Sequence, residues 1–221
     1  MQDKIVIVGS SGHAKVVIDI VEREGRYEIA GLLDHVRARG EQTLGYEVLG
    51  REGDLPRLLS DFGVNGAIVG IGDNYVRSQV VQRIAQLCPG LRFVSAVHPS
   101  SSIAKDVSIG EGTVIAPGVV LGPSCSIGRF CLINTQASLD HDCIMDDFSS
   151  VAPHGAVGGG CRIGAHSAIS IGAVLKHGIR VGDHTIVGAG ALVLSDLQSY
   201  RVAFGAPASE IRTRTPGEAY L

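Results

Sequence analysis

The stretch from Ile103 to Val193 has an aliphatic or near-aliphatic residue at every sixth position, with no polar exception. Glycine often follows this anchor residue, and small residues predominate four places after it. A six-residue repeat of this kind predicts a parallel β-helix, in which each unit is a short strand followed by a turn. The anchors are Ile103, Ile109, Ile115, Leu121, Ile127, Ile133, Leu139, Met145, Val151, Val157, Ile163, Ile169, Leu175, Val181, Val187 and Val193.

Stacking of identical units explains why such a repeat folds. One hexad cannot bury its anchor alone, but three hexads close a triangular coil, and the next coil stacks about 4.8 Å away. Residues eighteen positions apart should therefore lie above one another, so that the anchors form apolar columns inside the prism. Glycine after the anchor relieves crowding where the backbone turns a corner.

Short apolar runs alternate with amphipathic segments before the repeat begins. This alternation predicts a small parallel α/β domain. We therefore expect two domains, residues 1–97 and residues 98–221. The predicted strands are 4–9, 28–33, 67–71 and 91–97, the predicted helices are 15–24, 54–61 and 75–87, and residues 41–50 are expected to form a loop with a small strand.

Composition limits the classes of partner and compartment. The net charge of −3 gives no electrostatic reason to expect nucleic acid or an anionic membrane as a partner. The first residues contain only a short apolar run, too short for a signal peptide or a membrane span, so we expect a cytoplasmic protein.

The five cysteines are an odd number, which argues against a disulfide framework. Cys125, Cys143 and Cys161 lie eighteen apart and should stack, which raises the possibility of a metal ladder. Together with Cys131 they occupy the fourth place after an anchor, where small residues pack inward. Core packing as small hydrophobic side chains is the favoured interpretation, and no metal is expected.

Two features of the N-terminal region suggest a nucleotide site. The loop Gly9-Ser10-Ser11-Gly12-His13 is one glycine short of the dinucleotide fingerprint, but it still presents backbone N–H groups and a helix N-terminus to an anion. Asp34, at the end of the second strand, can reach the hydroxyls or base of a nucleotide. Ordinary turn chemistry explains both features equally well.

The combination of motifs is more specific than either feature alone. Gly-Ser-Ser-Gly-His, Leu-Leu-Asp, Ile-Gly-Asp-Asn followed by Arg77, and Val-His-Pro leading into the hexads resemble the hexapeptide-repeat sugar acetyltransferases. The similar branch contains the N-acetyltransferases of nucleotide-linked 4-amino sugars, of the bacillosamine and perosamine type, and the sialic acid O-acetyltransferases. The resemblance implies a Rossmann-like domain followed by a left-handed β-helix with a C-terminal cap, a homotrimer, and acetyl-CoA as co-substrate.

The same resemblance implies a set of substrate contacts in the N-terminal region. Arg77 could support the loop or neutralise phosphate, although an ordinary position on a helix surface is at least as compatible with the sequence. The implied nucleotide-sugar contacts are Ser11, Gly12, His13, Asp34, Gly72, Asp73 and Asn74.

Asp140, His141 and Asp142 interrupt a repeat that otherwise favours small residues at these positions. Acetylation of an amine needs a group that accepts the proton, and a neutral imidazole with an ordinary pKa of about 6.5 suits this role. An adjacent carboxylate can orient the ring. The resemblance assigns His141 as the base and Asp142 as its partner. The repeat places Gly159 one coil from His141, which leaves space for a pantetheine arm.

The resemblance also implies contacts with acetyl-CoA. Ser150 stands where the bacillosamine enzymes have a second histidine, and its hydroxyl can still donate one hydrogen bond to the thioester carbonyl. His154 is expected at the surface. The implied acetyl-CoA contacts are Ser150, Gly159, Ile171, Gly188, Ala189, Gly205 and Pro207.

The function expected from these features is acetyl-CoA-dependent N-acetylation of a UDP- or GDP-linked 4-amino-4-deoxy sugar for a bacterial surface glycan. Sialic acid O-acetylation, which needs no nucleotide, is the alternative. A γ-type carbonic anhydrase is disfavoured because its zinc needs three histidines, whereas the coil neighbour of His141 is Gly159. His166 and His184 should stack, but at a phase that faces solvent.

Overall fold

A computed structural model describes residues 2–220 and divides the chain into two compact units. The first unit comprises the residues up to Gly72 together with Val76–Pro99, and the second comprises Asp73–Tyr75 together with the residues from Ser100 onward. The expected architecture, a small Rossmann-like fold and a left-handed parallel β-helix, is confirmed.

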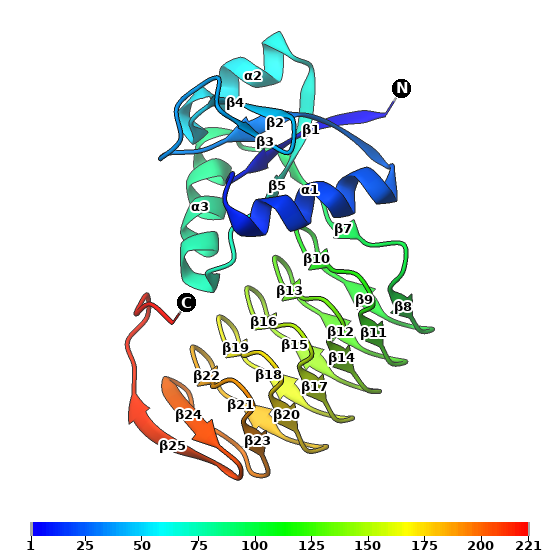
Figure 1. The fold of residues 1–221 in the computed structure, drawn as a ribbon, viewed down its shortest axis with the longest axis vertical. Coiled ribbons are helices and arrows are strands. Elements are labelled where there is room, and N and C mark those ends of the chain that lie inside the picture. The colour runs from blue at the N-terminus through cyan, green and yellow to red at the C-terminus, as the bar shows by residue number, and fades with distance from the viewer. Residues whose placement is uncertain (1, 221) are drawn as a thin grey trace. The chain divides into compact units, whose positions relative to one another are not determined.

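The first unit contains a six-stranded sheet with the order β3-β4-β2-β1-β5-β6. Helix α1 connects the parallel strands β1 and β2, and helix α3 connects β5 and β6, as the alternating sequence pattern predicts (Figure 1). The elements are β1 (Asp3–Val8), α1 (Gly12–Glu24), β2 (Tyr27–Leu33), β3 (Gln42–Thr43), β4 (Tyr46–Gly50), η1 (Glu52–Asp54), α2 (Leu55–Asp61), β5 (Val64–Val69), α3 (Asn74–Leu87), β6 (Arg92–Phe93) and β7 (Ala96–Val97).

Two segments of this unit differ from the sequence prediction. The expected loop with one strand is an antiparallel hairpin of β3 and β4, because Leu44 and Gly45 both adopt positive φ angles of 49° and 85° that suit a two-residue hairpin turn. The strand expected at residues 91–97 is broken into β6 and β7. The periodicity did not predict this break.

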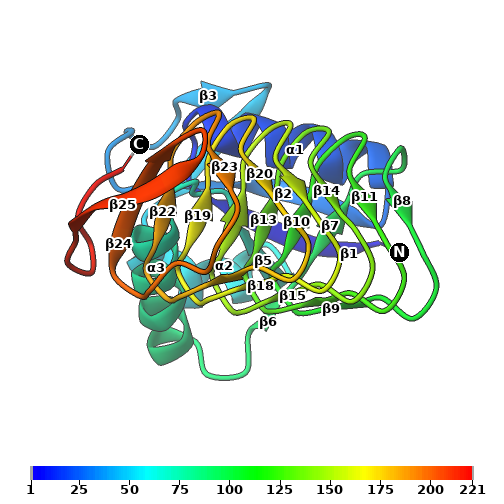
Figure 2. The same ribbon diagram turned by 90° about the horizontal axis from the view of Figure 1, so that it is seen from below.

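The second unit is a triangular β-helix whose successive coils stack side by side (Figure 2). We call its sheets the first, second and third sides. The first side contains β8 (Ser102–Ile103), β11 (Val120–Leu121), β14 (Ser138–Leu139), β17 (Ala156–Val157), β20 (Val174–Leu175) and β23 (Leu192–Val193). The second side contains β9 (Ser108–Ile109), β12 (Ser126–Ile127), β15 (Ile144–Met145), β18 (Arg162–Ile163) and β21 (Arg180–Val181). The third side contains β10 (Val114–Ile115), β13 (Leu132–Ile133), β16 (Ser150–Val151), β19 (Ala168–Ile169), β22 (Ile186–Val187), β24 (Arg201–Gly205) and β25 (Ala208–Thr213).

Each predicted anchor is the second residue of one of these two-residue strands. Most anchors are fully buried, for example Ile115, Val151 and Ile169, whereas Ile103 in the first coil is 38% exposed. Parallel pairing joins residues eighteen apart, as between Leu121 and Leu139. The predicted stacking of the hexads is therefore confirmed.

The small residues four places after each anchor also point inward. Cys125, Cys131, Cys143 and Cys161 are free and buried, which confirms their assignment to the core. The Cys125 thiol donates to the Asp140 carbonyl at 3.0 Å, so the core position still provides a hydrogen-bond partner.

The third residue after many anchors has a positive φ angle, which is uncommon for residues other than glycine. At the corner between the second and third sides these residues form a column of stacked rings. The rings of His166 and His184 lie 4.5 Å apart, as their spacing predicts, but they are half-buried rather than exposed because the column shields them. The column consists of Phe130, Phe148, His166, His184 and Tyr200.

The chain after Val193 extends the third side. Strand β24 pairs with β22 in parallel, and β25 pairs with β24 in antiparallel orientation. These strands cover an edge of the last coil that would otherwise be open to strand pairing, as expected. None of the helices described here is long and apolar enough to cross a membrane.

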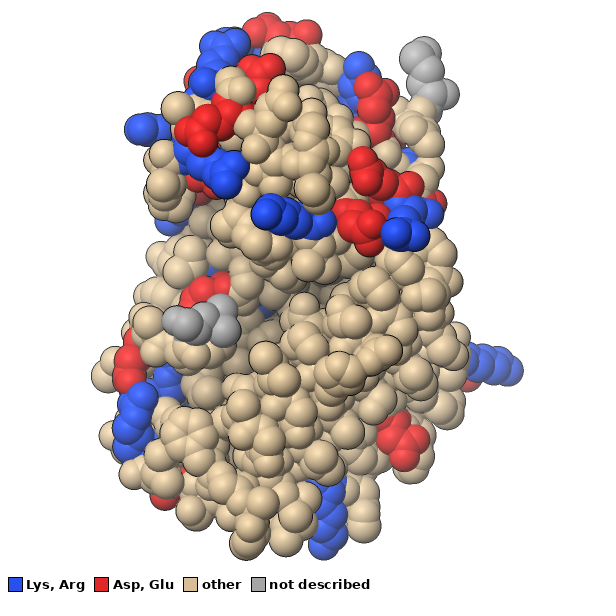
Figure 3. Space-filling model, in the orientation of Figure 1, with Lys and Arg blue, Asp and Glu red and all other residues tan. Residues whose placement is uncertain are grey.

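The three sides carry different residues at the outward-facing first position of each strand. On the second side these include the exposed Arg162 and Arg180. On the first side they are Ser102, Val120, Ser138, Ala156, Val174 and Leu192, none of which is charged. In the face of this unit that Figure 3 shows, charged side chains lie toward the margins and a broad central area has none.

Candidate active site

His141 lies on the turn between β14 and β15, at the corner between the first and second sides. Its Nδ1 lies 2.7 Å from Oδ2 of Asp142, and its backbone N–H donates to Oδ1 of Asp140 at 2.8 Å. The turn is also fixed to both neighbouring coils. Asp142 N–H donates to the Pro123 carbonyl, and Gly160 N–H donates to the His141 carbonyl. The sequence therefore places an imidazole and its carboxylate partner on a rigid corner.

Electrostatics around His141 favour its protonated form. The hydrogen bond with Asp142, followed by the charge of Asp140, raises the pKa of the imidazole above its ordinary value of 6.5. The side chain of His141 is 58% exposed, so its free Nε2 side is open to a ligand. His141 is therefore a stronger base than an ordinary histidine.

Gly159 lies directly beside the imidazole, as the eighteen-residue repeat predicts. A Cβ atom added at Gly159 would lie 2.6 Å from Nε2 of His141 and 2.8 Å from its Cε1. Ordinary carbon contacts begin near 3.4 Å, so no larger residue fits here without displacement of the ring. The glycine keeps the reactive nitrogen unobstructed.

Several residues assigned to acetyl-CoA gather at a different corner, between the third and first sides. Ile171 and Ala189 lie eighteen apart on successive turns and are exposed, Ile171 to 59%. Gly188 is buried under the ring of Phe204, which a Cβ at that position would strike. Gly205 and Pro207 follow Phe204 on the exposed end of the β24–β25 hairpin. The breadth of the first side separates this corner from His141 within one chain.

Ser150 does not join either group. It lies on the third side, it is 8% exposed, and its Oγ accepts a hydrogen bond from Nδ2 of Asn74 at 3.0 Å. His154, four positions further along the chain, is exposed, as predicted. Burial of Ser150 could not be deduced from the repeat, because it depends on a segment far away in the sequence.

In the first unit, a cavity of about 300 Å³ lies at the carboxyl ends of β1 and β2. Ser11 and Asp34 line it, as expected for a nucleotide site at this position of an α/β sheet. The lining also includes residues that the sequence did not single out, among them His35, Val36, Arg37, Glu52 and Val76. Ser10 lines the cavity as well, and it belongs to the same Gly-Ser-Ser-Gly-His motif as Ser11.

The carboxylate of Asp34 holds together the residues that line one part of this cavity. Its Oδ2 accepts from Ser10 Oγ at 2.6 Å, and its Oδ1 accepts from the N–H groups of Val36 and Arg37 at 2.8 and 3.1 Å. Partial burial acts to raise the pKa of Asp34, but these hydrogen bonds outweigh it and hold the pKa below its ordinary value. The carboxylate therefore organises the loop after β2.

Gly12, His13, Gly72, Asp73 and Asn74 lie outside the lining of this cavity. Burial, followed by the charge of Arg77, lowers the pKa of His13 to about 4, so its imidazole is neutral at pH 7. Its Nε2 is buried and accepts or donates no hydrogen bond within residues 2–220.

Arg77 is completely buried. Its guanidinium donates to the carbonyls of Ile71 and Gly72 at 3.0 and 3.1 Å. The interpretation of Arg77 as a support for this loop is confirmed, and its alternative placement on a helix surface is wrong. Gly72 thus has a fixed backbone, although the cavity lining does not include it.

Asn74 belongs to the second unit and is completely buried. Its Nδ2 donates to Ser150 Oγ and to the Ser167 carbonyl, both at 3.0 Å. The side chain predicted to contact substrate is thus engaged in contacts with the β-helix.

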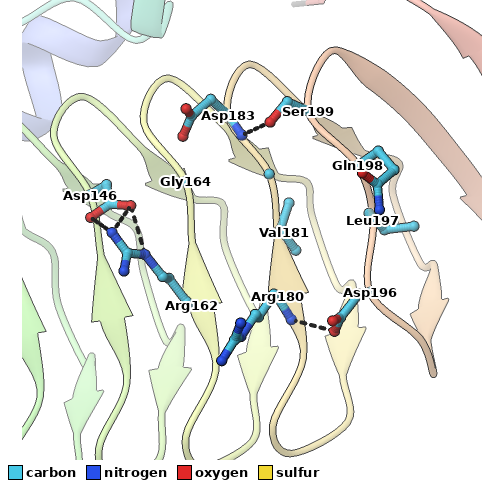
Figure 4. A pocket seen from close by; sticks show the side chains of 11 residues that line it. Asp146, Arg162, Gly164, Arg180, Val181, Asp183, Asp196, Leu197, Gln198 and Ser199 are labelled. Carbon is cyan, nitrogen blue, oxygen red and sulfur yellow. Dashed lines mark hydrogen bonds and ion pairs between the residues drawn. The ribbon is translucent and has the colours of Figure 1, made fainter.

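A second cavity, of about 310 Å³, lies on the second side (Figure 4). Figure 4 shows Arg162 paired with Asp146, at 3.1 Å between Nη2 and Oδ2, and the N–H of Arg180 donating to Asp196. None of the substrate, acetyl-CoA or catalytic residues predicted from the sequence lines this cavity. Across the described part of the chain, no group of three His, Cys, Asp or Glu side chains is arranged to hold a metal ion.

Comparison with known proteins places this geometry in a family. Residues 4–84 match the family model of the PglD N-terminal domain. UDP-N-acetylbacillosamine N-acetyltransferase from Bacillus subtilis is 30% identical over 115 residues, a region that spans half of this chain and half of that protein.

Solved structures extend the similarity to nearly the whole chain. Perosamine N-acetyltransferase PerB from Caulobacter crescentus, in complex with CoA and GDP-perosamine, is 34% identical, with a TM-score of 0.88 over 95% of this chain and 97% of that chain. The acetyltransferase domain of PglB from Neisseria gonorrhoeae, in complex with acetyl coenzyme A, is 30% identical, with a TM-score of 0.87 over 96% of this chain and 100% of that chain. The chain belongs to the hexapeptide-repeat sugar acetyltransferase family, in the branch that contains the bacillosamine and perosamine N-acetyltransferases.

Proposed function

We propose that the protein transfers the acetyl group of acetyl-CoA to the amino group of a UDP- or GDP-linked 4-amino-4-deoxy sugar. The observation that carries the proposal is His141, hydrogen-bonded to Asp142 at 2.7 Å, with the unobstructed space of Gly159 beside its Nε2. The bound ligands of the similar solved structures, CoA with GDP-perosamine and acetyl coenzyme A, support this substrate class over sialic acid.

The chemistry follows from the orientation of the imidazole. Asp142 accepts a hydrogen bond from Nδ1–H of His141, which leaves Nε2 as the basic nitrogen. The sugar amine attacks the thioester carbonyl carbon, and Nε2 takes the proton that the new amide nitrogen loses. The C–S bond then breaks, and the CoA thiolate leaves and takes up a proton. Charge on Asp142 stabilises the imidazolium that forms between these steps.

The N-terminal cavity supplies the proposed nucleotide contacts. Its floor includes Val8, Leu33 and Ile71, and its rim carries Ser11 and the loop held by Asp34. An apolar floor with a few fixed polar groups suits a nucleobase and ribose. The helix α1 begins at Gly12 and presents unpaired N–H groups to a diphosphate.

The reaction is tested by release of free thiol from acetyl-CoA over UDP-, GDP- and dTDP-linked 4-amino sugars and free sialic acid. We expect turnover with a UDP- or GDP-linked amino sugar and formation of its N-acetyl product by mass spectrometry. Turnover restricted to sialic acid would replace the proposal with O-acetylation, and absence of turnover across the panel would refute the substrate class. We place this reaction in the cytoplasm, and its product would serve the biosynthesis of bacterial surface glycans.

We also propose that the active form is a homotrimer assembled through the first side. On the third side, the chain itself covers the outward residues, with Asn74 over Ser150 and Tyr220 over Ala168 and Ile186. On the first side, by contrast, the outward-facing Val120 and Val174 are 47% and 43% exposed. An uncharged apolar face of this kind marks an interaction surface. Association through it would bring the corner of His141 on one copy toward the corner of Ile171 on another.

Val174→Glu should therefore convert the trimer to monomers, because it places a charge within the apolar face. The matched control is Ile144→Glu, which changes a residue of similar exposure, 40%, at the equivalent strand position of the second side. Size-exclusion chromatography with light scattering measures both masses. A trimer that survives Val174→Glu, or dissociates only with Ile144→Glu, would move the interface elsewhere.

A further inference from the structure

The C-terminal segment Arg214–Tyr220, which we call the strap, is held firmly on the third side of the β-helix. The ring of Tyr220 packs against Ala168, Ile186 and Val202. Arg214 is only 8% exposed, its guanidinium lies 5.4 Å from the centre of the Tyr220 ring, and it donates to the carbonyls of His184 and Glu218. The buried guanidinium of Arg214, with these hydrogen-bond and ring partners, fixes the strap to the β-helix.

The strap also contacts the short segment Asp73–Tyr75, which belongs to the same unit. The N–H of Asn74 donates to the hydroxyl oxygen of Tyr220 at 3.1 Å. The ring of Tyr75 lies against Gly217, where an added Cβ would come within 2.8 Å of Cε1. Residues more than 140 positions apart in the sequence are thus joined through both a polar and an apolar contact.

Asn74 is consequently held at two points. Its side chain donates to Ser150 and Ser167 on the β-helix, and its main chain donates to Tyr220 of the strap. Asn74 opens helix α3, and the first N–H groups of a helix have no partner within the helix itself. The Tyr220 hydroxyl oxygen accepts a hydrogen bond from the first of these N–H groups, that of Asn74.

We propose that the strap is a positioning element for the nucleotide-sugar substrate, with Tyr220 as its positioning residue. It fixes the backbone of Asn74, and therefore the orientation of Asp73 and Gly72, the residues immediately before it. This inference rests on the proposed function, in which Gly72 and Asp73 contact the nucleotide sugar. A segment ordered in advance loses less conformational freedom when substrate binds, so the strap lowers KM for that substrate alone.

Tyr220→Phe tests this role without removal of the packing. The phenyl ring retains its contacts with Ala168, Ile186 and Val202, and only the acceptor oxygen is lost. We expect KM for the nucleotide sugar to rise roughly 2- to 10-fold, the value of one hydrogen bond. KM for acetyl-CoA should stay at the wild-type value, and the melting temperature should fall by no more than about 2–4 °C, the effect of one lost hydrogen bond. Tyr200→Phe is the matched control, because the Tyr200 hydroxyl forms no hydrogen bond with other residues of the described chain.

Two further measurements separate this inference from the proposed reaction. Hydrogen exchange followed by mass spectrometry should show faster exchange of a peptide that contains Asn74 and Tyr75 in Tyr220→Phe, whether or not a sugar substrate is turned over. Calorimetric titration with GDP-perosamine should show a larger Kd for Tyr220→Phe than for the wild type. An unchanged KM and Kd for nucleotide sugar, an equal rise in KM for acetyl-CoA, or unchanged exchange would each overturn the positioning role.

Discussion

His141→Asn should lower kcat for acetyl transfer by about 10²- to 10⁴-fold, the usual contribution of a general base. Asparagine is of similar size and remains polar, but its side-chain amide cannot accept a proton near pH 7. His141 is an exposed turn residue, so the melting temperature should not change. Single-turnover measurement of thiol release with saturating nucleotide sugar would isolate the chemical step. Undiminished turnover would remove His141 from this role.

Asp142→Asn tests whether Asp142 is the cause of the raised pKa of His141. The base must be deprotonated to act, so activity falls as the pH drops through the pKa of His141. The hydrogen bond with Asp142 is the largest cause that raises this pKa, with the charge of Asp140 second. Loss of the Asp142 charge should therefore shift the acidic limb of the pH profile of kcat/KM to lower pH. A limb that does not move would show that another group titrates.

Gly159→Ala should have the second large effect, with a fall in kcat/KM of about 10²-fold. The new methyl group would lie 2.6 Å from Nε2 of His141, so the ring must rotate away from its position beside Asp142. Displacement of a catalytic group by about 1 Å commonly costs this much in rate. The ring moves into solvent, so the fold should tolerate the change.

The matched control for Gly159→Ala is Gly53→Ala. An added Cβ at Gly53 meets no atom within 4 Å, and neither glycine has a left-handed backbone. Steady-state kinetics and thermal melting of both variants decide the outcome. Activity retained in Gly159→Ala would show that the imidazole does not act from the observed position. A fall in melting temperature together with activity would instead assign Gly159 a structural role.

The periodic part of this protein was predictable to the residue. Anchors every six positions must point inward, and three hexads must close one coil, so the contact between Gly159 and His141 follows from a separation of eighteen. The same arithmetic placed Cys125, Cys143 and Cys161 inside the prism. Adjacent charged residues at one corner marked His141, because the rest of the repeat favours small side chains there.

Contacts that do not follow the six-residue repeat could not be predicted from the sequence. Asp34 and Asn74 were predicted as substrate contacts, but nothing in the sequence indicated that Asp34 holds Ser10 and the loop at residues 36–37 with both of its oxygens. Asn74 is buried against Ser150, a contact across 76 positions. The left-handed backbone of Asp142, Phe148 and His166 also lacked a sequence signal, because no single residue type marks that position.

The amino-acid sequence by itself determined the two fold types, the stacking of the coils and the corner at which His141 stands, because these depend on local pattern and repeat length. Only the tertiary structure showed which polar side chains hold distant parts of the protein together. Hydrogen-bonding groups such as Asp34 and Asn74 can serve this purpose, which depends on partners that folding brings from distant positions.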